Sequence, residues 1–127
     1  MRPESELYLS KAHDLLRESE AASHAGAQNA QGRAAYLAAF HAAQAIIFEL
    51  SGKAAKTHRG VHSEFQRLTR NEPRLEPGLR SFLSRAYELK SIADYEIGPE
   101  ATVAPDKAAE ALEMARRFVA HIEALLA

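Results

Sequence analysis

Residues 32–51 read Gly32-Arg-Ala-Ala-Tyr36-Leu-Ala-Ala-Phe40-His41-Ala-Ala-Gln-Ala-Ile-Ile47-Phe-Glu-Leu50-Ser51, the most apolar stretch of the chain. Its larger side chains recur every three or four residues. This spacing predicts a helix from about Gln31 to Ser51 with one apolar stripe, formed by Tyr36, Phe40, Ala43, Ile47 and Leu50. Gly52 follows and can adopt the left-handed conformation that ends a helix. The many alanines let neighbouring helix axes approach closely, so we expect a central helix that contacts at least two others.

Four further segments have helical periodicity and are bounded by proline or glycine. The first runs from Pro3 to about Gly26 and places Leu7 among its apolar positions. The others are Arg59 to Arg70, Leu79 to Tyr95, and Pro105 to near the end of the chain, with a loop from Asn71 to Gly78. No segment alternates with the period of a strand. The sequence predicts one all-α domain over residues 1–127, an antiparallel up-and-down bundle of four to five helices.

The composition excludes several classes of protein. Sixteen basic and 17 acidic residues give a net charge of −1, so any contact with nucleic acid must be local. The absence of cysteine excludes disulfides, thiolate zinc sites and cysteine nucleophiles. The first residues lack the apolar core of a signal peptide, and no run reaches the roughly 18 apolar residues of a membrane span. We expect a soluble, cytoplasmic protein without a membrane partner.

Two histidines have a spacing that occurs at metal sites. His58 and His62 are four residues apart, which would place both rings on one helical face. Two ligands do not define a site, and the pair is more typical of surface histidines. The chain has no GxGxxG or P-loop pattern and no mark of a serine triad. We therefore expect no metal and no cofactor.

Three groups of polar residues are candidates for a binding site. Lys56-Thr57-His58-Arg59 precedes a helix, where free amides favour phosphate; alternatively Thr57 or His58 caps the helix while the cations face water, which the residues alone favour. Tyr36 and His41 interrupt the apolar helix, either as hydrogen-bonded core residues, which is the more frequent case, or beside a cleft. Lys90 and Asp94 are spaced for an ion pair within one helix.

Three blocks of the sequence together resemble the HEPN superfamily, specifically its small prokaryotic single-domain proteins. The first block is the aromatic, alanine-rich stretch Ala34–Ala43. The second is Gly52 followed by Lys56-Thr-His-Arg-Gly-Val61 and Phe65. The third is Leu89-Lys-Ser-Ile-Ala-Asp-Tyr95, with lysine where the family has arginine. With Phe118-Val119, the similarity covers nearly the whole chain.

The resemblance implies a helical bundle that is usually a homodimer. It also implies a partner, a minimal nucleotidyltransferase that forms a toxin–antitoxin pair with it. Active HEPN ribonucleases carry Arg-x(4–6)-His, in which histidine does acid–base work and arginine stabilises developing charge. Here that spacing occurs only at Arg17–His24 and Arg116–His121, outside the block where the motif belongs. That block holds Lys90 and Asp94, so whether the chain is an enzyme stays open.

These observations lead to one hypothesis about the site. We expect the ends of the third and fourth helices to converge on a polar cleft for a nucleotide, an RNA phosphate or a loop of a partner. The expected lining residues are Lys56, Thr57, His58, Arg59, Lys90, Asp94 and Tyr95, with Tyr36 and His41 as further candidates. The resemblance implies that Tyr95 could accept a nucleotide. The alternatives are a metal-independent toxin ribonuclease that recruits His41 or His58, and a non-catalytic bundle that binds a partner.

Overall fold

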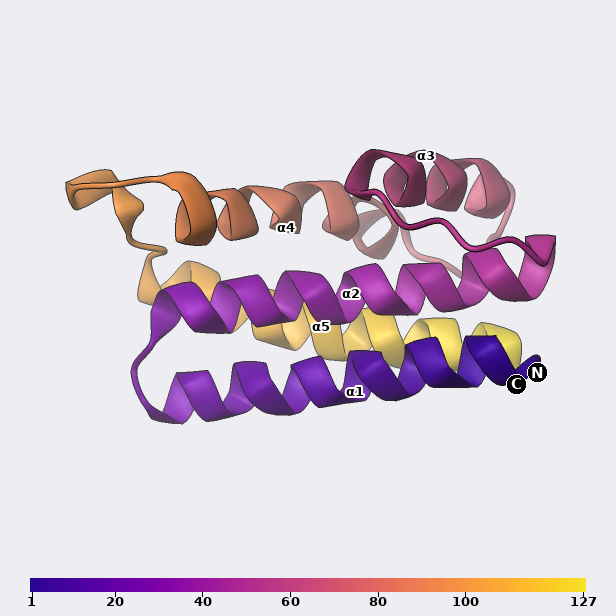
Figure 1. Ribbon diagram of the computed structural model, residues 1–127, viewed down its shortest axis with the longest axis horizontal. Coiled ribbons are helices and arrows are strands. Elements are labelled where there is room, and N and C mark those ends of the chain that lie inside the picture. The colour runs from indigo at the N-terminus through magenta and orange to yellow at the C-terminus, as the bar shows by residue number, and fades with distance from the viewer.

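The computed structural model describes all 127 residues and contains helices but no strand. The elements in chain order are α1 (Pro3–His24), α2 (Gln28–Ser51), α3 (His58–Thr69), α4 (Pro77–Tyr95), the short 3-10 helix η1 (Pro99–Ala101) and α5 (Pro105–Leu126). Figure 1 shows α1, α2 and α5 side by side along the long axis, with α3 and α4 above them and both termini at one end. The four long helices alternate in direction, which confirms the expected all-α bundle.

The helix ends follow their proline and glycine residues. Gly26 and Gly52 have φ angles of 69° and 72° and terminate α1 and α2 in the left-handed conformation. Helix α2 begins at Gln28, three residues before the predicted start. Helix α4 begins at Pro77 and not at Leu79, because proline needs no hydrogen-bond partner in a first turn.

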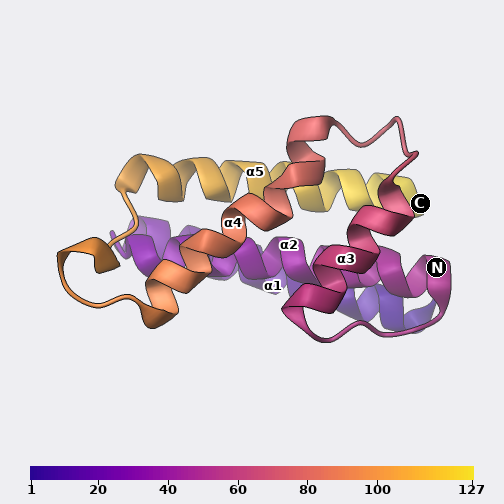
Figure 2. The ribbon, with the colours of Figure 1, turned by 90° about the horizontal axis from the view of Figure 1, so that it is seen from above.

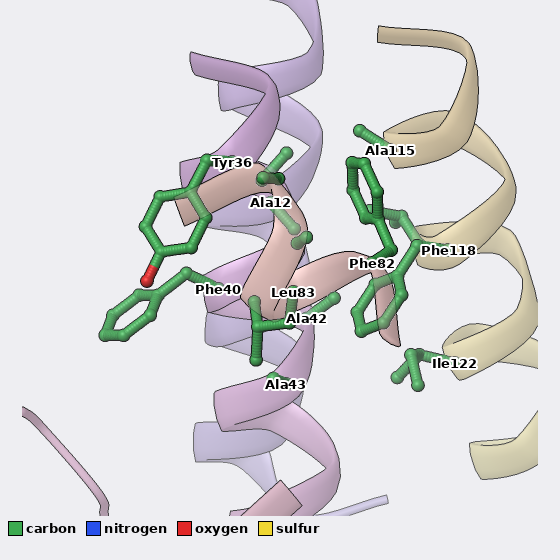
Figure 3. Packing of buried hydrophobic residues seen from close by; sticks show 14 of the residues in the cluster. Ala12, Tyr36, Phe40, Ala42, Ala43, Phe82, Leu83, Ala115, Phe118 and Ile122 are labelled. Carbon is green, nitrogen blue, oxygen red and sulfur yellow. The ribbon is translucent and has the colours of Figure 1, made fainter. Parts of the chain in front are cut away.

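Helix α2 is the centre of the bundle. It contacts all four other α-helices, which confirms the expected contact with at least two. Six of its alanines are completely buried, and without longer side chains they let α1, α4 and α5 pack close to its backbone: Ala35, Ala38, Ala39, Ala42, Ala43 and Ala45. Figure 3 shows Tyr36 and Phe40 on one side of this core, and Phe82, Phe118 and Ile122 on the other.

Two leucines that the apolar stripes included are not in the core. Leu7 is 70% exposed and Leu50 is 55% exposed, so their predicted inward positions are wrong. Leu7 lies at a groove between α1 and α2 that no third helix covers. Leu50 lies in the last turn of α2, just before the chain turns away at Gly52.

By length and apolar composition alone, α2 would suffice to cross a membrane. However, 67% of its most apolar window is buried inside the bundle. A mostly buried core helix meets the same criteria as a membrane span. The apolar character of α2 is therefore accounted for by its central place in the core.

Candidate functional site

Tyr36 joins α2 to α3 through two hydrogen bonds. Its side chain is fully buried, and its hydroxyl oxygen is 2.7 Å from Nδ1 of His58 and 2.9 Å from Nε2 of His62. The two histidines are one helical turn apart, so both rings reach the same hydroxyl. Their four-residue spacing also occurs at metal sites, but here it lets both rings hydrogen-bond to one tyrosine. No group of three or more metal-binding side chains is present.

Aromatic rings hold His58 in place. Its ring stacks on Tyr87 of α4 at 5.2 Å and on Tyr36 at 5.6 Å, and it lies 4.7 Å from the ring of Phe40. Tyr87 also meets His62 edge to face at 5.4 Å. We call these five side chains, Tyr36, Phe40, His58, His62 and Tyr87, the tyrosine–histidine cluster. It fixes the start of α3 against both α2 and α4.

The start of α3 is capped by Thr57. The Thr57 hydroxyl accepts a hydrogen bond of 2.9 Å from the backbone N–H of Gly60, which satisfies one of the free amides of the first turn. A Cβ at position 60 would lie 2.8 Å from that hydroxyl, so the tight cap requires glycine. The capping interpretation is confirmed, and Lys56 and Arg59 are exposed and make no ion pair.

A second group of polar side chains lies further along α4. Asp94 accepts from Nζ of Lys90 at 2.9 Å and from Nε of Arg33, on α2, at 2.9 Å. The Lys90 side chain is only 9% exposed, and its ammonium lies 5.1 Å above the ring of Tyr95. We call Arg33, Lys90, Asp94 and Tyr95 the ion cluster. The predicted pair of Lys90 with Asp94 is present.

Electrostatics link the two clusters. The hydrogen bond from Lys90 lowers the pKa of Asp94, and the same bond raises the pKa of Lys90, so both are charged at neutral pH. Burial lowers the pKa of His58, and the positive charge of Lys90 lowers it further. Burial, then the neighbouring His58, lowers the pKa of His62. The ion cluster is thus charged while the neighbouring histidines are neutral.

These shifts predict that the protein loses stability as the pH falls below about 6.5, the ordinary histidine pKa. The unfolded chain takes up protons there, while folded His58 and His62 resist them. The free energy of unfolding should therefore decrease between pH 6.5 and 5, as followed by urea denaturation. A His58→Gln/His62→Gln double variant should show a shallower decrease, since only His41 then keeps a pKa lowered by burial.

Exposed His24 provides the matched control for this measurement. A His24→Gln variant should keep the slope of the wild-type protein over the same pH range. An equal slope in wild type and in the double variant would contradict the assignment of the pH dependence to the tyrosine–histidine cluster.

The structure brings together only part of the predicted cleft. The start of α3 meets Tyr87 in the middle of α4, and not its end: Tyr95 lies eight residues further on, about 12 Å along the helix axis. His41 Nδ1 donates to the side-chain oxygen of Gln44 at 2.8 Å, and His41 lines the groove between α1 and α2, apart from the tyrosine–histidine cluster. Sequence reasoning missed Arg33 and Tyr87 altogether.

Comparison with known proteins gives two matches. The family model described as HEPN domain matches residues 5–125. The chain is 35% identical over 117 residues to a UPF0332 protein of Archaeoglobus fulgidus, covering 91% of this chain and 90% of that protein. Both matches include the second helix and the two stretches that carry the polar clusters.

Proposed function

Because the chain belongs to the HEPN domain family, which supports a role related to nucleotides or RNA, we propose that it binds the phosphate of a nucleotide or an RNA in the cytoplasm. The proposed binding surface consists of Arg33 and Lys90 of the ion cluster together with His58. One observation carries the proposal: Arg33 and Lys90 share the carboxylate of Asp94, and Lys90 is near enough to His58 to lower the pKa of its ring.

The charges of the ion cluster favour an anion. Arg33 and Lys90 contribute +2 and Asp94 contributes −1, which leaves a net charge of +1 on three neighbouring side chains. Guanidinium and ammonium groups bind phosphate through charge-assisted hydrogen bonds. Exposed Lys56 and Arg59 add positive charge at the start of α3, where the helix dipole is also positive. This local charge can act although the whole chain has a net charge of −1.

The proposal includes two protein partners. We propose a homodimer, which light scattering on the purified chain tests. We also propose a minimal nucleotidyltransferase, as the other half of a toxin–antitoxin pair, that transfers a nucleotide from a nucleoside triphosphate to the Tyr95 hydroxyl. The tyrosine oxygen replaces pyrophosphate on the α-phosphorus and loses its hydrogen, and pyrophosphate leaves. Tyr95 is 70% exposed and its hydroxyl is 3.5 Å from Nζ of Lys90, so an enzyme can reach it. A mass gain of one nucleotide that survives Tyr95→Phe would refute this assignment.

A titration followed by NMR tests where phosphate binds. Adding a short single-stranded RNA to ¹⁵N-labelled protein should shift the backbone signals of Arg33, His58, Lys90 and their neighbours. The signals along the groove between α1 and α2, around Lys11 and His41, should stay in place. Shifts concentrated in that groove, or no shifts with RNA or AMP, would contradict the proposed binding surface.

A further inference from the structure

The Tyr36 hydroxyl lies between two histidine nitrogens but carries a single hydrogen. Nδ1 of His58 and Nε2 of His62 are both within hydrogen-bond distance of its oxygen. A phenol hydroxyl donates one hydrogen bond and accepts others. Both rings are neutral at neutral pH because burial lowers the pKa of each. The hydroxyl therefore donates to one ring and accepts from the other.

Two arrangements of hydrogens satisfy both contacts. In the first, the hydroxyl donates to Nδ1 of His58 and accepts from Nε2 of His62, so each ring carries its hydrogen on Nε2. In the second, the hydroxyl donates to Nε2 of His62 and accepts from Nδ1 of His58, so each ring carries its hydrogen on Nδ1. A neutral imidazole has one N–H and one acceptor nitrogen. The hydrogen position on one ring thus fixes that on the other.

The outer nitrogens of the two rings are free to meet a ligand or water. Nε2 of His58 and Nδ1 of His62 make no hydrogen bond within the protein. Neither is fully buried, since the fully buried polar atoms without a partner are Ser5 Oγ and Arg80 Nε. Of the two histidines, His58 is the one whose charge state responds to Lys90 and Asp94. His58 is therefore the histidine nearer to the ion cluster, and Nε2 is its free nitrogen.

We propose that Tyr36 and His62 are positioning residues that set the hydrogen on His58, so that its Nε2 donates to a bound phosphate while the ring stays neutral. This proposal rests on the phosphate site proposed above. A phosphate oxygen only accepts hydrogen bonds here, so it selects the first arrangement. Through the Tyr36 hydroxyl, the same ligand also fixes the hydrogen of His62, a residue that it does not touch.

Two matched variants test the coupling without a ligand. Long-range ¹H–¹⁵N spectra of the histidine rings show which nitrogen carries the hydrogen. In His62→Lys the ammonium only donates, so the hydroxyl donates to Nδ1 of His58 and the hydrogen of His58 should lie on Nε2. In His62→Glu the carboxylate only accepts, so the hydroxyl must donate to it and the hydrogen of His58 should move to Nδ1. The same hydrogen position on His58 in both variants would overturn the proposal.

A titration with AMP tests the link to phosphate. In the wild-type protein the ring signals of both His58 and His62 should shift, whereas in Tyr36→Phe only those of His58 should shift. An equal response of His62 in Tyr36→Phe overturns the coupling through the hydroxyl. If AMP leaves His58 unchanged while the Lys and Glu variants differ as expected, the coupling is upheld and the phosphate site is overturned. Should Tyr36→Phe not fold, the Lys and Glu variants decide alone.

Discussion

Replacing Phe118 with alanine is expected to lower the free energy of unfolding by about 3–5 kcal/mol, the usual cost of removing a buried aromatic ring. Phe118 of α5 is completely buried. Its ring lies 5.4 Å from that of Phe65 on α3 and 6.1 Å from that of Phe82 on α4, and Figure 3 shows it beside Phe82 and Ile122. Its loss leaves a cavity where three helices meet.

Urea denaturation followed by circular dichroism measures this effect. Ile97→Ala is the control, because Ile97 is 87% exposed and an exposed substitution should change stability by no more than about 0.5 kcal/mol. A loss of less than about 1 kcal/mol for Phe118→Ala would contradict the packing of α5 against α3 and α4.

The helices themselves were predictable from sequence because their signals are local. Periodic apolar residues and proline and glycine at the ends set α1, α2, α3, α4 and α5 to within three residues. The pair of Lys90 with Asp94 was predictable for the same reason, since residues four apart are neighbours on a helix. Local signals do not determine how the helices cross in space. Figure 2 shows that α4 crosses α2 obliquely and that α3 lies beside α4.

That crossing decides which residues form the site. Arg33 and Asp94 are 61 positions apart in the chain. Tyr87 meets His58 because residues of α3 and α4 both pack against Tyr36 of α2. No repeat or motif relates such residues. The sequence does predict that His41 lies apart from Tyr36. His41 is five residues after Tyr36, so it points about 140° away around the helix.

Charge changes within the ion cluster should alter RNA binding in opposite directions. Lys90→Met removes a cation and should weaken binding of a short RNA about tenfold, or about 1.4 kcal/mol. Asp94→Asn removes the carboxylate that Lys90 and Arg33 share. Because Asp94 is ionised at neutral pH, with its pKa lowered by Lys90, this variant frees both cations and should strengthen binding several-fold.

The two controls repeat these charge changes on α1, away from α3 and α4. Lys11→Met and Asp14→Asn lie on exposed positions of that helix. They alter the net charge of the chain by the same amounts. They therefore distinguish RNA binding at a local site from attraction of RNA by the net charge of the whole chain. Circular dichroism should confirm that all four variants keep the helical content of the wild-type protein.

Titrating the wild-type protein, Lys90→Met and Asp94→Asn with one labelled RNA at one salt concentration tests most directly whether the ion cluster and His58 bind phosphate. The expected order of affinity is Asp94→Asn above wild type, and wild type above Lys90→Met, with both α1 controls close to wild type. Equal affinities for all proteins would contradict a phosphate site at Arg33, His58 and Lys90. Changes in RNA affinity that are as large in the α1 control variants as in Lys90→Met and Asp94→Asn would contradict it too.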